Sequence, residues 1–360
     1  RTPWGAAVNV ADRGSDGVRR YFVENAVSWI RDLHLDGLRL DAVHAIVDPT
    51  PTPFVEELTD AVHDAADAAG RTALVTIESS ANDPRIVRPT SEHGWDCDAV
   101  WNDDFHHALR VALTGERHEY YRAYAGAADV AAAWEGRWVY SGQYSPSFDR
   151  RHGAPADAID HRHFVVFDTN HDHVGNTPRG DRMLSDVAPD DPRHRLAAAA
   201  VLLSPFTPML FMGEEYGETS PFPYFIDHGD PDLVEAVRVG RQREFSGADW
   251  SGPVADPADP STFEAAVLDV TLTEREPHRS RLAMYTELLR LRRAHRLLTD
   301  PSAQQHVSFV DDALFVVRSG PGETASLVFN FSDEDVDHRS PGPADAVVFD
   351  SDDTRWGGPG

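Results

Sequence analysis

The sequence contains no lysine. All 33 of its basic residues are arginine, against 60 aspartates and glutamates, which gives a net charge of −27 over 360 residues. So negative a surface repels phosphate backbones and anionic lipids, and this argues against a nucleic acid or a membrane as the main partner. An acidic chain without lysine resembles proteins from a salt-saturated cytosol, where ions screen this repulsion, although an arginine-rich genome is the alternative. We therefore expect a halophilic protein with a neutral ligand.

Cysteine and long apolar runs are also scarce. Cys97 is the only cysteine in the sequence, so no internal disulfide can form and nothing requires an oxidising compartment. No stretch reaches the roughly 18 to 20 consecutive apolar residues of a membrane-spanning helix, and no leader-like segment opens the chain. We expect a cytoplasmic location. Because the chain begins at Arg1 and ends in a turn-like Gly-Gly-Pro-Gly, we also expect a fragment at both ends.

What is present is the composition of an ordinary folded domain, with 41% hydrophobic and 26% charged residues. Short apolar runs alternate with amphipathic stretches. We expect helices at 15–35, 54–69, 105–114, 193–203 and 282–297, and strands at 36–41, 72–77, 98–101, 164–168 and 208–212. This alternation indicates βαβ units around a parallel sheet.

The repeats favour an α/β fold of the (β/α)8 TIM-barrel type, with the N-terminal strands missing from this chain. We expect the partial barrel to cover residues 1–300, with an insertion rich in Asp, Pro and Ser near 249–279. A small C-terminal antiparallel β domain would follow over 301–360, built from short runs at 307–310, 314–318, 326–331 and 346–349. We expect this last domain to be truncated.

The first motif is the octet from Gly37 to His44. On a strand, residues two apart share a face, so Arg39 and Asp41 point the same way. The guanidinium would keep the carboxylate ionised at neutral pH, as a carboxylate nucleophile requires. A structural Arg–Asp pair at a strand end explains the octet equally well.

The second motif is an apolar strand that ends in a carboxylate, Glu78. Burial of its neighbours would raise its pKa and keep it protonated for general-acid work. A glutamate just past a strand is more often a solvated loop residue.

The third motif runs from Phe164 to Asn176. Four apolar residues lead into Asn170, His171 and Asp172, which brings an imidazole and a carboxylate to the end of a strand. His171, Asp172 and His173 are all competent metal ligands. Neighbouring strand residues face opposite ways, however, so we expect neither a metal nor another cofactor here.

These three motifs resemble the second, third and fourth signature regions of the α-amylase superfamily of glycoside hydrolases. The resemblance implies a (β/α)8 barrel with Asp41 as nucleophile, Glu78 as general acid/base and Asp172 as the third carboxylate of the site. Because retaining glycosidases hold their two carboxyl groups roughly 5 to 5.5 Å apart, we expect that separation between Asp41 and Glu78. His173 stands where relatives commonly carry glutamine.

Within the superfamily, segments 38–46, 101–109 and 208–217 resemble those of malto-oligosyltrehalose trehalohydrolases. This implies that the substrate is a trehalose-capped malto-oligosaccharide, cleaved at the α-1,4 linkage next to its terminal trehalose. The expected substrate-binding residues are Arg39, His44, Asn102, Asp103, Asp104, His106, His171 and Asn176. A glucan branching enzyme, an α-amylase-type hydrolase and an inactive glucan-binding barrel fragment are the alternatives.

Several segments have a second interpretation. Segment 101–107 also fits a helix N-terminus capped by Asp103 or Asp104. Aromatic and basic residues suggest a trehalose-binding loop, and these are Tyr120, Tyr121, Phe148, Arg150 and Arg151. An ordinary solvated loop is the alternative. We expect structural roles for Glu214 and Glu215. The superfamily's first signature region is absent, so the missing N-terminal part of the barrel is an expected partner.

Overall fold

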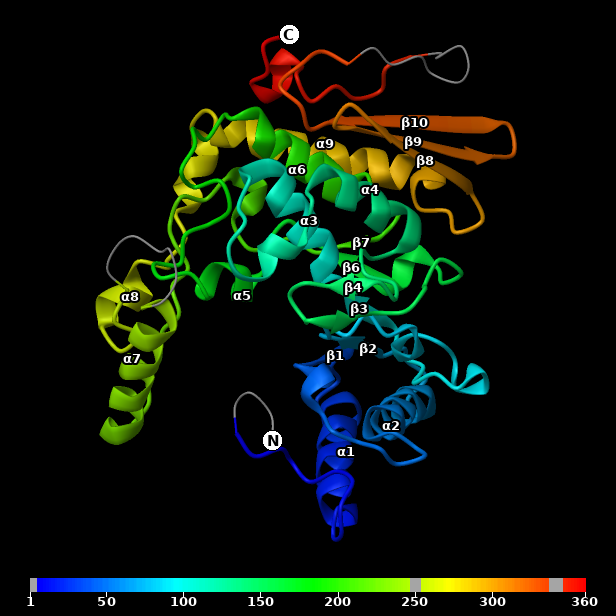
Figure 1. Ribbon diagram of the computed structural model, residues 1–360, viewed down its shortest axis with the longest axis vertical. Helices are drawn as coiled ribbons and strands as arrows, with labels where there is room; N and C mark the ends of the chain where they lie inside the picture. Colours follow the sequence, from blue (N-terminus) through cyan, green and yellow to red (C-terminus); the bar gives the residue numbers. More distant parts are fainter. Residues whose placement is uncertain (1–4, 247–253, 337–345) are drawn as a thin grey trace. The chain divides into compact units, whose positions relative to one another are not determined.

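The computed structural model describes residues 5–246, 254–336 and 346–360 (Figure 1). Its helices are α1 (Asp16–Arg31), α2 (Phe54–Ala68), α3 (Asp103–Thr114), α4 (Ala127–Gly136), α5 (His171–Gly175), α6 (Pro192–Leu202), α7 (Pro231–Phe245), α8 (Pro260–Glu264) and α9 (His278–Ala294). Its strands are β1 (Gly37–Leu40), β2 (Leu74–Ile77), β3 (Ala99–Trp101), β4 (Tyr144–Ser145), β5 (Arg150–Arg151), β6 (Phe164–Val166), β7 (Thr207–Pro208), β8 (Gln304–Val310), β9 (Ala313–Gly320) and β10 (Glu323–Asn330). Within these ranges, no helix combines the length and the apolar character needed to cross a membrane.

The chain divides into two compact units. The first contains the described residues up to Phe105 together with Ala132–Val166, and the second contains His106–Ala131 together with the described residues from Phe167 onward. This division does not fall near residue 300, where the sequence suggested that a barrel gives way to a β domain. That domain boundary stays a prediction.

The first unit is built on a parallel sheet in the order β1-β2-β3-β6. Val75, Ile77 and Val100 at its centre are almost completely buried. Helix α2 turns Leu58, Val62 and other apolar residues inward and packs against α1. Alternating strands and helices thus give the parallel arrangement that the sequence predicted.

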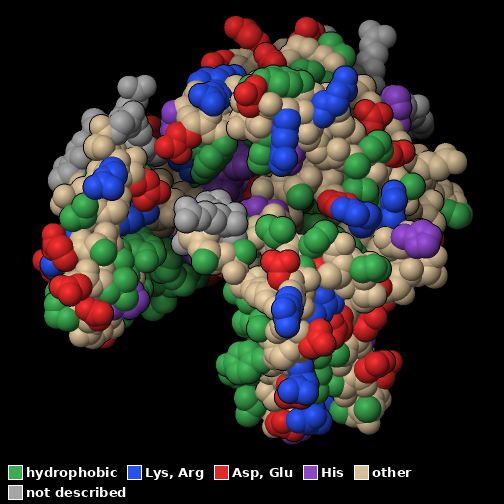
Figure 2. Space-filling model, turned by 60° about the horizontal axis from the view of Figure 1, so that its bottom comes forward, with side chains coloured by type: hydrophobic (Ala, Val, Ile, Leu, Met, Phe, Trp, Pro, Cys, Tyr) green, Lys and Arg blue, Asp and Glu red, His purple; other side chains and the backbone are tan. Residues whose placement is uncertain are grey.

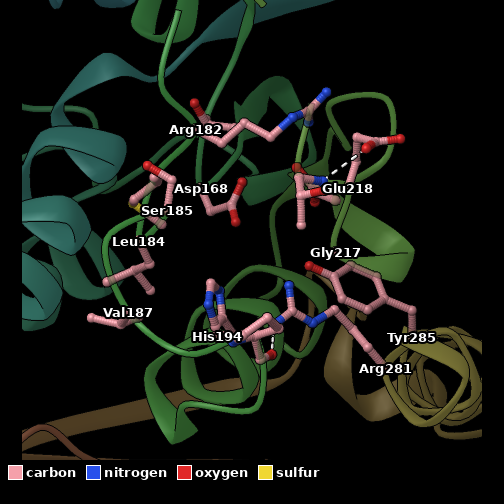
Figure 3. Close-up of a pocket in the computed structure, with 15 residues that line it drawn as sticks. Asp168, Arg182, Leu184, Ser185, Val187, His194, Gly217, Glu218, Arg281 and Tyr285 are labelled. Atoms are coloured by element: carbon pink, nitrogen blue, oxygen red, sulfur yellow. Dashed lines mark hydrogen bonds between the residues drawn. The ribbon is translucent and has the colours of Figure 1, made fainter. Parts of the chain in front are cut away.

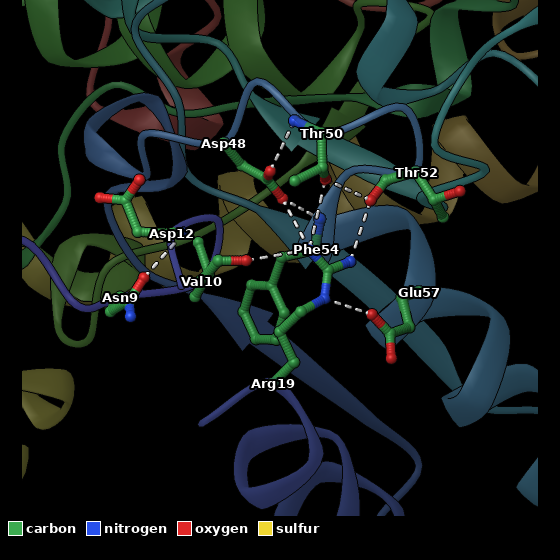
Figure 4. A network of polar contacts seen from close by, with 9 residues as sticks. All are labelled: Asn9, Val10, Asp12, Arg19, Asp48, Thr50, Thr52, Phe54 and Glu57. Carbon is green, nitrogen blue, oxygen red and sulfur yellow. Dashed lines mark hydrogen bonds and ion pairs between the residues drawn. The ribbon is translucent and has the colours of Figure 1, made fainter. Parts of the chain in front are cut away.

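A polar network fixes the loop between β1 and α2 to α1 (Figure 4). The Arg19 guanidinium on α1 contacts Asp48 Oδ2 at 3.1 Å and Glu57 Oε2 at 2.5 Å. It also donates to the Val10 carbonyl at 3.1 Å and the Thr52 carbonyl at 2.9 Å. One largely buried arginine therefore ties together four separate parts of the first unit.

The second unit contains an antiparallel sheet in the order β10-β9-β8, and a pair of packed helices, α6 and α9. The fully buried Arg318 on β9 donates to the carbonyls of Leu297 and Asp300, at 2.9 Å and 2.7 Å. The sheet is thereby fixed to the segment that follows α9.

On the face drawn in Figure 2, acidic side chains and arginines lie interspersed.

The structure corrects several boundaries. Strand β7 covers only Thr207–Pro208 instead of 208–212, because the Phe211 N–H donates to Glu214 Oε2 at 2.8 Å and the chain turns. Residues 346–349 form no strand. The expected insertion at 249–279 contains α8 and the start of α9, and its residues 249–253 lie outside the described ranges. The α/β class with a C-terminal antiparallel sheet agrees with the prediction, and closure of a barrel stays a prediction.

Candidate active site

Two carboxylates leave the ends of neighbouring strands in the first unit. The parallel register pairs Leu40 with Ile77, so the next residues, Asp41 and Glu78, follow at the same edge of the sheet. Backbone hydrogen bonds fix this junction: the Glu78 N–H donates to the Leu40 carbonyl at 2.9 Å, and the Val43 N–H donates to the Glu78 carbonyl at 3.0 Å. The structure thus brings together the two residues that the sequence assigns to nucleophile and acid/base.

Arg39 connects the two carboxylates. Its Nη1 donates to Asp41 Oδ1 at 2.8 Å, and its Nη2 forms an ion pair with Glu78 Oε2 at 2.9 Å. The Trp101 ring at the end of β3 covers the guanidinium, whose Cζ lies 4.1 Å from the ring centroid. The cation is therefore held between two anions and an aromatic face, which limits its side-chain freedom.

The two carboxylates differ in environment. The Asp41 side chain is 76% exposed, whereas that of Glu78 is only 17% exposed. Burial is the main cause that raises the pKa of Glu78, and the Asp41 carboxyl adds to it. The Ala42 N–H, donated to Glu78 Oε2 at 2.8 Å, and the Arg39 charge act in the opposite direction. The arrangement offers an accessible carboxylate beside a shielded carboxyl that retains its proton to higher pH.

Residues after β3 lie in the protein interior. Asn102 caps α3, since its Oδ1 accepts the Phe105 N–H at 3.2 Å, and its amide donates to the Arg137 carbonyl at 2.6 Å. The buried Asp104 accepts the N–H groups of Val139 and Tyr140, both at 2.9 Å. These side chains position loops within this chain, so their contact with a sugar stays a prediction.

The other expected substrate-binding residues differ in exposure. His44 is exposed and Asp103 is half-buried, both in the first unit. His106, in the second unit, is completely buried, with ring nitrogens bonded to the Asp168 carbonyl and the Tyr121 hydroxyl. Tyr121 is buried as well, which removes it from the surface loop suggested by the sequence.

The third motif forms a short helix, α5, instead of continuing as a strand. Asn170 caps this helix, and its Oδ1 accepts the N–H groups of Asp172 and His173, at 3.0 Å and 3.1 Å. His171 and Asp172 are partly exposed, with His171 Nε2 3.5 Å from Asp172 Oδ2. Asn176 Oδ1 is 3.4 Å from Arg241 Nη1. Asp172 belongs to the second unit, so its convergence with Asp41 and Glu78 stays a prediction.

A cavity of about 120 Å³ lies in the second unit, beside the residues that precede α5 (Figure 3). Asp168, Glu214, Arg182 and Arg281 are among its lining residues. Burial, followed by the Asp168 charge, raises the pKa of Glu214 well above its usual range, which favours a proton shared between these two carboxyls. Asp168 and Glu214 lie 46 positions apart and belong to no common motif, so this pair could not be recognised from the sequence.

The hairpin β4–β5 presents an aromatic surface in the first unit. The Phe148 ring, partly exposed, stacks on His152 with centroids 3.8 Å apart and an interplanar angle of 6°. The Arg150 guanidinium lies 5.8 Å from the Phe148 centroid. A flat ring held by a second ring is a suitable platform for the apolar face of a sugar.

Comparisons with known proteins agree with the geometry. Malto-oligosyltrehalose trehalohydrolase of Arthrobacter ramosus is 43% identical over 320 residues, which cover 88% of this chain and 55% of that enzyme. The enzyme of the same name from Saccharolobus solfataricus is 38% identical over 332 residues, covering 92% of this chain and 55% of the relative. A solved structure of an α-amylase-type protein from Salmonella typhimurium matches with a TM-score of 0.82 at 33% identity, covering 96% of this chain and 60% of that one.

No protein-family model matches the chain. The chain spans about half the length of the curated relatives it matches. Over nearly all of its own length the chain is similar to part of the malto-oligosyltrehalose trehalohydrolases and to part of the solved α-amylase-type structure.

Proposed function

We propose that the protein is a retaining glycoside hydrolase that releases trehalose from trehalose-capped malto-oligosaccharides. The observation that carries the proposal is the Asp41–Arg39–Glu78 cluster, with one exposed carboxylate and one shielded carboxyl at adjacent strand ends. The relatives named malto-oligosyltrehalose trehalohydrolase, at 38% to 43% identity, supply the substrate class.

In the first step, an Asp41 oxygen attacks the anomeric carbon of the glucosyl unit next to trehalose. As this bond forms, the bond from C1 to the glycosidic oxygen breaks, and Glu78 gives its proton to the departing trehalose oxygen. The raised pKa of Glu78 suits it to this donation near neutral pH, because more of the protonated form is then present.

In the second step, water hydrolyses the glucosyl–enzyme ester. Glu78, now ionised, takes a proton from the water as its oxygen attacks C1, and Asp41 leaves as a carboxylate. Arg39 contacts both groups, so it balances the negative charge that moves from Asp41 to Glu78 in the first step and back to Asp41 in the second. We assign to Asp172 and His171 the role of binding sugar hydroxyl groups.

The test is product identification. The full-length protein is incubated in molar salt with maltopentaosyl trehalose, and the released sugars are separated by chromatography. We expect trehalose as the main disaccharide, and a loss of at least about 10³-fold in rate for Asp41→Asn, since the nucleophile is removed. Asp36→Asn is the matched control, because Asp36 lies just before the same strand, is 94% exposed, and pairs with Arg71.

The alternatives give different products. Maltose without trehalose would indicate an α-amylase-type hydrolase, and new α-1,6 linkages would indicate a branching enzyme. Glucan binding without turnover would indicate an inactive binding protein. Each of these three results contradicts the trehalose-releasing activity.

A further inference from the structure

Three imidazoles that take no part in the proposed bond-making and bond-breaking steps meet in the second unit. His106 and His107 are consecutive on α3, and His173 lies on α5. One ring nitrogen from each lies within 4.8 Å of the others. The sequence grouped His173 with His171 and Asp172, but in the structure its ring stacks on His106, with centroids 3.4 Å apart.

Hydrogen bonds prepare two of these rings for a ligand. His106 Nδ1 lies 2.5 Å from the Asp168 carbonyl oxygen, which can only accept, so the proton is on Nδ1 and Nε2 carries a lone pair. His107 Nδ1 is 3.2 Å from the Tyr124 hydroxyl, which leaves its Nε2 for another partner. Metal-binding histidines are typically oriented in this way, with the second nitrogen bonded to a carbonyl or a polar side chain.

One nitrogen of the third ring is buried without a polar partner among the described residues. His173 is 7% exposed, and its Nδ1 is buried with no hydrogen bond to the described part of the chain. Buried polar nitrogens are nearly always bonded to protein, water or an ion. The His173 nitrogen therefore calls for a partner that the side chains around it do not supply.

The charges around the cluster permit a cation. Burial lowers the pKa of each of the three imidazoles, which disfavours their charged forms. The Arg110 charge acts on these histidines, but Arg110 is bonded to Glu116 at 2.9 Å and 3.1 Å, which offsets that charge.

We propose that His106, His107 and His173 bind a divalent transition-metal ion of the zinc class, with water at the remaining position. Three imidazoles are a common ligand set for Zn²⁺, and it prefers nitrogen ligands to the carbonyl and carboxylate oxygens that suit Mg²⁺ or Ca²⁺. The site includes none of the three carboxylates of the proposed hydrolytic site. It would join α5 to α3 and so steady the helix that also carries Asp172.

Binding requires one ring to turn. The His106 and His173 rings are nearly parallel, at 9°, so their nitrogen lone pairs do not converge on one point. His106 is held by two hydrogen bonds, so His173, whose Nδ1 has no partner among the described residues, is the ring that would turn. The Tyr121 hydroxyl, 3.0 Å from His106 Nε2, must also give up that contact.

The test uses full-length protein without a polyhistidine tag, dialysed against a chelator and then titrated with Zn²⁺ or Co²⁺. We expect one tightly bound zinc per chain by elemental analysis, and a Co²⁺ absorption spectrum of the tetrahedral type. His173→Gln removes one ligand, whose Nδ1 has no hydrogen-bond partner among the described residues, and should weaken zinc binding by about 100-fold or more. Thermal unfolding and circular dichroism establish that this variant is folded.

His171→Gln is the matched control, since it changes the neighbouring exposed histidine on the same helix. We expect its zinc stoichiometry and Co²⁺ spectrum to equal those of the unchanged protein. The proposal is overturned if no stoichiometric zinc binds, if a folded His173→Gln variant binds zinc as before, or if His171→Gln abolishes binding. If no stoichiometric zinc binds, a buried water is the partner of His173, and the proposal that the protein releases trehalose still stands.

Discussion

Arg39 Nη2 lies 2.9 Å from Glu78 Oε2, and this ion pair opposes the effect of burial on the same carboxyl. Burial favours the protonated form of Glu78, whereas the guanidinium favours the ionised form. The net pKa of Glu78 is raised, so desolvation prevails over the ion pair. A residue that must give a proton in one step and take one in the next benefits from such opposed influences.

The first prediction concerns stability and pH. The pKa of Glu78 is higher in the folded protein than in the unfolded chain. The folded protein therefore loses stability as pH rises above the usual pKa of a glutamate, because Glu78 then ionises more readily in the unfolded chain. Glu78→Gln cannot ionise. The free energy of unfolding of Glu78→Gln minus that of the unchanged protein should therefore increase from pH 4 to pH 7. The variant is expected to lose activity at both pH values. Urea unfolding at both pH values measures this, and a relative stability that falls over that range would show that the pKa is not raised.

The second prediction concerns the Arg19 network of Figure 4. Arg19→Met leaves the buried Asp48 carboxylate without its cation and removes donors to two carbonyls. We expect the free energy of unfolding to fall by about 3 kcal/mol, the scale for breaking a buried ion pair. Arg20→Met on the same helix is the control. Its partner Glu24 is 3.9 Å away and both side chains are exposed, so a change within about 0.5 kcal/mol is expected. Equal effects of the two substitutions would exclude a stabilising role for the network.

The third prediction concerns the aromatic surface of the β4–β5 hairpin. If Phe148 stacks on the trehalose unit, Phe148→Ala should raise KM for maltopentaosyl trehalose about 5- to 10-fold, the size of a single stacking contact. The ratio of trehalose to maltose among the products should fall. Phe263→Ala, an exposed phenylalanine of α8, serves as the control. An unchanged product ratio for Phe148→Ala would refute trehalose recognition by this ring.

The fourth prediction concerns salt. A net charge of −27 should repel itself strongly in dilute buffer, and ions shorten the range of this repulsion from about 10 Å at 0.1 M to about 3 Å at 1 M. We expect the melting temperature to rise between 0.1 and 2 M KCl. An equal osmolarity of sucrose separates charge screening from general solute exclusion. A melting temperature that is constant or falls with KCl would contradict halophilic adaptation.

The local features of the site could be predicted from the sequence. Apolar runs that end in Asp41 and Glu78 mark two consecutive parallel strands, and parallel strands bring their carboxyl ends to one edge. The Arg39–Asp41 contact follows from the two-residue repeat of a strand. Both inferences need only neighbours in the chain or in the sheet.

Contacts between distant segments could not be predicted. Asp104 is buried and accepts hydrogen bonds from Val139 and Tyr140, which lie more than 30 positions later and which the sequence did not connect with it, while its contact with a sugar stays a prediction. His173 was grouped with its sequence neighbours on a strand, whereas the cap at Asn170 starts a helix and redirects the ring toward His106. Helix α7 was missed because little of it is buried, so its sequence has a weak apolar repeat.

The most direct test of the account asks which residue forms the covalent bond to sugar. The full-length Glu78→Gln variant is mixed with an α-malto-oligosyl fluoride, whose fluoride departs without acid catalysis, and peptides are then mapped by mass spectrometry. Hydrolysis of the ester needs the missing base, so the adduct should accumulate on the peptide that contains Asp41, and Asp41→Asn should abolish it. An adduct on another carboxylate, or turnover to a product of inverted configuration with no adduct, would contradict the assignment of Asp41 as nucleophile.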